Sequence, residues 1–116
     1  MLVHKVSTRE IAFRDLLASD MILIKTQYST YGFLVVDARD RRGVLWGSSL
    51  KNDLPNVVLV ARATKTGKEN RVDLSSLKTG SRAIFYVGNC ASGWRLTTSV
   101  ITGLDHIRCG ARRRLS

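Results

Sequence analysis

The sequence predicts a mainly β protein: a small SH3-like or OB-like barrel of five to six antiparallel strands with one N-terminal helix. Its 116 residues suit a single domain with one hydrophobic core. After residue 20, short runs of β-branched and aromatic residues alternate with Gly, Asn, Asp and Ser, a pattern typical of strands and turns. We therefore expect one barrel domain over residues 1–107, followed by a basic mobile tail over residues 108–116.

The helix is expected at about residues 8–19, the one stretch with helical periodicity. Ser7 and Glu10 have the spacing of a capping box, in which each side chain bonds a backbone N–H at the start of a helix. The apolar residues that follow recur at spacings that give one stripe: Ile11, Phe13, Leu16 and Leu17. This stripe would pack against the barrel.

The strands are read from apolar runs bounded by turn residues. They are expected over residues 21–26, 31–37, 44–49, 57–64, 82–88 and 94–102. A polar, Arg-rich turn over residues 38–43 joins the second and third strands into a hairpin. Residues 72–80 look irregular and end in a turn at Gly80.

The last hairpin has the most specific prediction. Pairing Val87 with Trp94 also sets Phe85 opposite Leu96 and Ala83 opposite Thr98, and these three pairs share the core face. Because strand side chains alternate between faces, Tyr86 and Arg95 are expected opposite each other on the polar face.

Charge is the strongest indication of a partner. The chain has 19 Lys and Arg against 9 Asp and Glu, a net charge of +10, and the excess stays positive without the four Arg of the tail. Such a surface attracts polyanions by its long-range field. There is no export-signal pattern and no apolar run of the ~20 residues that a spanning helix needs, so we expect a cytoplasmic protein without a membrane partner.

Neither cofactor nor metal motifs stand out. Cys90 and Cys109 are too few and too far apart for a zinc site, and His4 and His106 do not complete a ligand set. Free thiols are the expectation in a reducing compartment, with a disulfide between the two cysteines as the alternative.

The leading hypothesis is a non-enzymatic protein that binds RNA or single-stranded DNA. Arginine suits phosphate recognition because its planar fork donates two hydrogen bonds, and strand aromatics supply stacking surfaces. The expected nucleic-acid-binding residues are Arg39, Arg41 and Arg42 in one loop, Arg62, Lys65, Lys68 and Arg71 around another, Tyr86 and Arg95 on the last hairpin, and Arg112, Arg113 and Arg114 at the C-terminus. Further aromatics that could stack on bases are Tyr28, Tyr31 and Trp46.

Two alternatives belong to other classes. One is an interaction module that docks on an acidic protein partner or assembles with copies of itself, for which an unclosed strand pair would serve. The other is a metal-free endoribonuclease of the toxin type, with His106 or Asp37 as base beside Arg39 or Arg95. Toxins of that type have a similar length, but their Arg-Pro dipeptide before an apolar strand is missing here.

Overall fold

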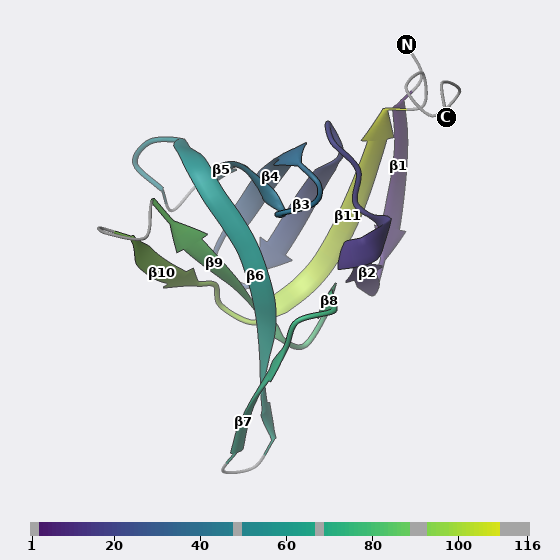
Figure 1. The fold of residues 1–116 in the computed structure, drawn as a ribbon. Helices are drawn as coiled ribbons and strands as arrows, with labels where there is room; N and C mark the ends of the chain where they lie inside the picture. Colours follow the sequence, from purple (N-terminus) through teal and green to yellow (C-terminus); the bar gives the residue numbers. More distant parts are fainter. Residues whose placement is uncertain (1–2, 48–49, 67–68, 89–92, 110–116) are drawn as a thin grey trace.

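The computed structural model describes residues 3–47, 50–66, 69–88 and 93–109 (Figure 1). These residues form strands with one short 3-10 turn, which confirms a mainly β protein. In chain order the elements are β1 Val3–Thr8, β2 Glu10–Ala12, η1 Phe13–Asp15, β3 Met21–Thr26, β4 Thr30–Asp37, β5 Arg42–Gly47, β6 Leu54–Thr66, β7 Glu69–Asp73, β8 Ser76–Lys78, β9 Arg82–Val87, β10 Trp94–Thr97 and β11 Ile101–Cys109.

One large antiparallel sheet carries the fold. Its strands follow the order β1-β11-β3-β4-β5-β6-β9-β10, and β7 pairs with the far end of β6 as a projecting arm (Figure 1). A second, two-stranded sheet joins β2 to β8. Arg108 and Cys109, which the sequence assigned to the tail, belong to β11, where they pair with His4 and Val3. Residues 110–116 lie outside the described residues.

The core fills the concave side of this curled sheet. Phe33 of β4 and Phe85 of β9 are fully buried, and their ring centroids lie 5.4 Å apart in a tilted arrangement. Leu45 and Leu59 are equally buried around them. Because side chains alternate along a strand, every second residue of β5, β6 and β9 faces outward, away from the core.

The predicted barrel is not closed, and its likeness to SH3 or OB barrels is not confirmed. Within the described residues no ladder joins β1 to β10, the two ends of the strand path, so the sheet is open. The chain after β10 makes a few bonds toward β9: the N–H of Thr98 donates to the Ala83 carbonyl and that of Ile101 to the Ser81 carbonyl. β11 then pairs with β3 and β1 instead of continuing alongside β10.

The predicted N-terminal helix is wrong, because strand partners from distant parts of the chain take up its residues. Ser7 donates its hydroxyl to Asp105 Oδ1 on β11 at 2.7 Å, so it caps no helix. Ile11 pairs with Leu77 in the ladder between β2 and β8. Ile11 is buried as expected, but as a strand residue.

The last hairpin has the predicted register. Trp94 pairs with Val87, Arg95 with Tyr86 and Leu96 with Phe85. The predicted strand over residues 94–102 is divided, however: β10 ends at Thr97 and β11 begins at Ile101. Trp94 keeps half of its surface exposed because β10 is an edge strand of the open sheet.

Candidate functional site

One row of side chains crosses four strands on the outer face of the sheet. Arg42 of β5 pairs with Val58 of β6, Val58 pairs with Tyr86 of β9, and Tyr86 pairs with Arg95 of β10. We call these four residues the Arg–Tyr row. Neighbouring strands lie about 4.8 Å apart, so the two arginines are about 14 Å apart with the tyrosine between them.

The Arg–Tyr row faces solvent. Arg42 and Arg95 are exposed, and Val58 and Tyr86 are half-buried. Arg42 donates Nη1–H to Asn56 Oδ1 at 2.6 Å, which holds its guanidinium over the sheet without neutralising its charge. Among the described residues, neither arginine of the row forms an ion pair. Both therefore keep an uncompensated positive charge for an anion, and Arg42 also keeps the N–H donors that Asn56 does not use.

The β4–β5 turn divides its predicted arginines between two roles. Arg39 is exposed. Arg41 is half-buried: its Nε–H donates to the Leu59 carbonyl at 2.8 Å, and its guanidinium lies 4.9 Å from the centre of the Phe13 ring. Such a contact stabilises the turn, so Arg41 is a structural residue rather than a surface cation.

Arg62, at the base of the β6–β7 arm, is occupied by acidic and hydroxyl partners. Its guanidinium bonds Ser76 at 2.9 Å, Asp73 at 3.3 Å and Glu10 at 3.5 Å. The pKa of the Glu10 carboxyl is lowered, chiefly by the hydrogen bond from Ser76 and then by Lys78 and Arg62. Arg62 thus links β2, β7 and β8, and the carboxylates of Glu10 and Asp73 compensate its charge.

The other predicted residues are dispersed. Arg71 is exposed on β7, opposite Thr64. Lys65 lies on β6, but its side chain is outside the described residues, as are Lys68, Arg112, Arg113 and Arg114 in full. The structure therefore brings together three of the predicted residues, Arg42, Tyr86 and Arg95.

The remaining aromatics differ in accessibility. Tyr31 is a core residue and offers no stacking surface, whereas Tyr28 in the β3–β4 turn is 77% exposed. Trp46 lies flat over Gly32 on the outer face, because a Cβ at Gly32 would come within 2.3 Å of its ring. Trp46 is thus held by β4.

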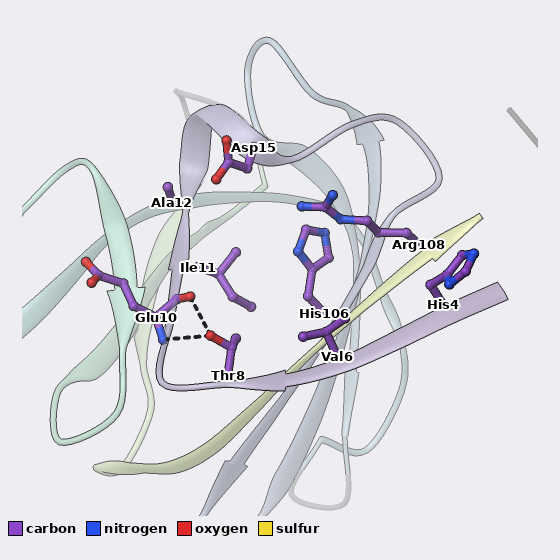
Figure 2. Close-up of a pocket in the computed structure, with 9 residues that line it drawn as sticks. All are labelled: His4, Val6, Thr8, Glu10, Ile11, Ala12, Asp15, His106 and Arg108. Carbon is purple, nitrogen blue, oxygen red and sulfur yellow. Dashed lines mark hydrogen bonds between the residues drawn. The ribbon is translucent and has the colours of Figure 1, made fainter. Parts of the chain in front are cut away.

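A cavity of about 610 Å³ lies at the other end of the molecule, between β1, β2, η1 and β11 (Figure 2). Its lining consists of His4, Val6, Thr8, Glu10, Ile11, Ala12, Asp15, His106 and Arg108. Neither Asp37, Arg39 nor Arg95 belongs to this lining, so the cavity does not join His106 to the partners considered for a ribonuclease.

His106, which lines this cavity, forms a buried pair with Asp20, which does not line it. His106 Nε2 lies 2.9 Å from Oδ2 of Asp20, which is fully buried and also accepts the N–H of Leu17 at 3.0 Å. Ser19, at φ 72°, donates its N–H to the Val35 carbonyl and fixes the loop that carries Asp20. No local sequence pattern indicates this pair, because its members are 86 residues apart.

In the described residues, no group of His, Cys, Asp and Glu side chains is arranged to hold a metal ion. No helix in that part of the chain is long and apolar enough to span a membrane.

Comparison of the chain with protein-family models, curated proteins and solved structures gave no match.

Proposed function

We propose that this protein binds single-stranded nucleic acid, RNA or DNA, without cleaving it, on the outer face of β5, β6, β9 and β10. The observation that carries the proposal is the Arg–Tyr row: Tyr86 stands between Arg42 and Arg95, and neither arginine forms an ion pair among the described residues. Proteins that bind single strands combine a positive surface for phosphates with aromatic side chains on which bases stack.

The net charge of +10 supports the same proposal, because it attracts a polyanion before any specific contact forms. The outer face of the sheet suits an unpaired strand better than a duplex, since an unpaired base can lie on the Tyr86 ring. Reading a duplex in the major groove calls for a helix or a β-ribbon that fits the groove. In the described residues the one helical element is η1, of three residues, and the two-stranded β6–β7 arm lies outside the Arg–Tyr row.

The test is fluorescence anisotropy with a labelled single-stranded oligonucleotide across a salt series. Binding that weakens steeply with rising salt is expected, because each phosphate contact releases counterions. Tyr86→Leu keeps an apolar side chain in the sheet and removes the stacking ring, and should weaken binding by about five- to a hundredfold, the range for one base stacked on an aromatic. Arg42→Gln and Arg95→Gln should each lower the salt slope by about 0.7.

Arg14→Gln is the matched control, because Arg14 is an exposed arginine of η1 outside the Arg–Tyr row. It should leave the affinity much closer to that of the wild type. If all four variants bind alike, or if the wild type binds no more tightly than an unrelated protein of equal net charge, the proposal is wrong.

The open sheet favours one second function, assembly with a copy of itself or with another, acidic protein. β1 and β10 are edge strands among the described residues, and unpaired edges are templates for strand addition. Light scattering tests this proposal. A dimer whose mass is unchanged by oligonucleotide would support it, and a monomer at all concentrations would refute self-assembly.

A further inference from the structure

The cavity beside β1 has the size and composition of a small-molecule site. Its volume of about 610 Å³ falls in the range of ligand pockets, about 300–1,000 Å³. Val6, Ile11 and Ala12 give it apolar walls, and polar groups stand around them. Such a combination suits a ligand with a flat apolar body and polar edges.

His106 provides one fixed polar group. The residue is only 6% exposed, and its Nε2 is engaged by Asp20. The ring points into the cavity (Figure 2), and its other nitrogen, Nδ1, has no hydrogen-bond partner among the described residues. A carboxylate behind an imidazole fixes the orientation of the ring, so Nδ1 is presented to a ligand in one direction.

Two opposite charges face the same cavity from different elements. Arg108 extends from β11 and Asp15 from η1 (Figure 2), and within the described residues neither forms an ion pair. Glu10 does not add to this charge, because its carboxylate is turned away toward Arg62 and Ser76. A ligand that satisfies both groups must present hydrogen-bond acceptors on one edge and donors on another.

Among the nucleobases, guanine meets this requirement. Its O6 and N7 accept hydrogen bonds and are the atoms that arginine contacts most often, whereas its N2–H₂ and N1–H on another edge donate and suit a carboxylate. Adenine places its N6 donor beside N7 and has only acceptors on its opposite edge. Cytosine and uracil lack the second ring that would cover the apolar wall.

We propose that this cavity binds a guanine base, with Arg108 on its O6/N7 edge, Asp15 on its N1/N2 edge and the ring against Ile11. The base could belong to a free nucleotide or to a single strand held by the Arg–Tyr row. The second source rests on the proposed function. Unpaired bases of single strands are commonly splayed out and recognised by their edges in this way.

The experiment is titration of the ¹⁵N-labelled full chain with GMP, AMP and inorganic phosphate, followed by amide chemical shifts. GMP should shift amides of β1, β2 and β11 in a saturable manner, at least about fivefold more tightly than AMP, because one good pair of base contacts is lost with adenine. Equal affinity for GMP and AMP, shifts elsewhere only, or full competition by phosphate would overturn the proposal.

Variants locate the site. Arg108→Gln and Asp15→Asn should each weaken GMP binding by at least about fivefold. Arg9→Gln and Asp53→Asn are the matched controls, because both residues are exposed and neither lines the cavity. The amide spectrum of each variant shows whether it is folded. If the controls weaken GMP binding as much as the cavity variants, the base is bound elsewhere and the proposal is wrong.

Oligonucleotides separate this proposal from the proposed function. A guanine-free strand that binds through Tyr86, together with no GMP binding, would overturn the guanine pocket and leave the Arg–Tyr row standing. Saturable GMP binding without strand binding would support the pocket, with a free nucleotide as its ligand, and would refute the proposed function.

Discussion

Removing the Asp20 carboxylate is expected to destabilise the protein severely. In Asp20→Ala, His106 Nε2 and the N–H of Leu17 both lose their acceptor, a carboxylate that is fully buried. Two hydrogen bonds to a carboxylate, at about 1.5–3 kcal/mol each, give a loss of about 3–6 kcal/mol. For a domain of about 100 residues the thermal midpoint should fall by at least about 12 °C.

Urea unfolding followed by circular dichroism measures this loss directly. Asp20→Asn is the companion variant, because an amide oxygen can still accept from Leu17, and its loss should be about 1–2 kcal/mol. Asp40→Ala, an exposed position, should change stability by no more than about 0.5 kcal/mol. If Asp20→Ala loses less than about 1 kcal/mol with an unchanged denaturant slope, Asp20 does not hold its loop to β11 and the reasoning fails.

Three other outcomes are expected. Gly43→Ala would place a Cβ 1.9 Å from the Leu34 carbonyl oxygen. Because this clash would force β4 and β5 apart, the free energy of unfolding measured in urea should fall by about 3 kcal/mol or more. The pKa of Asp105 lies below its ordinary value, chiefly because Ser7 donates a hydrogen bond to it. Ionised Asp105 therefore stabilises the folded protein fully above about pH 4, and this stabilisation is lost as the pH falls through the lowered pKa of the folded state. Because Ser7→Ala removes the main cause of that lowering, its thermal midpoint should decline less steeply than that of the wild type as the pH falls from about 7 to about 2. Arg42→Gln and Arg95→Gln combined should lower the salt slope of oligonucleotide binding by about 1.4, and a slope equal to that of the wild type would remove both residues from the site.

Local patterns predicted the strands that pair with sequence neighbours. The bounds of β3, residues 21–26, were predicted residue for residue, and so was the pairing of Tyr86 with Arg95. In both places apolar residues bounded by turn residues determine the structure, and the partner strand follows within a few residues. The period of two then fixes which side chains face the core.

Long-range pairing was not predictable in this way. β1 is a mixed polar and apolar segment, and its partner β11 lies about a hundred residues away in sequence. Contacts between residues distant in sequence also explain why the helix prediction was wrong. Ser7 and Glu10 have the spacing of a capping box, but their side chains find Asp105 and Ser76 on other strands. Tertiary partners outweigh a local capping preference of about 1 kcal/mol.

The candidate site was likewise predictable from local patterns only in part. Sequence alone placed Tyr86 and Arg95 on one face, but it assigned Arg42 to a separate loop cluster. The three residues share a row only because β5 and β9 both pair with β6, and register shifts after Gly43 and after Leu59 interrupt those ladders. A shift of one residue would turn Arg42 to the other face, and no local pattern specifies it.

The open sheet accounts for the cavity that a closed barrel would lack. A small closed barrel has an interior just wide enough for its own side chains to fill. Here β11 lies between β1 and β3, and residues of β1, β2, η1 and β11 line a cavity of about 610 Å³. The edge that prevents closure thus gives His106 and Arg108 access to a ligand, whereas the core under β6 and β9 stays filled by Phe33 and Phe85. Ligand access at one end and a filled core at the other are both consequences of the same strand order.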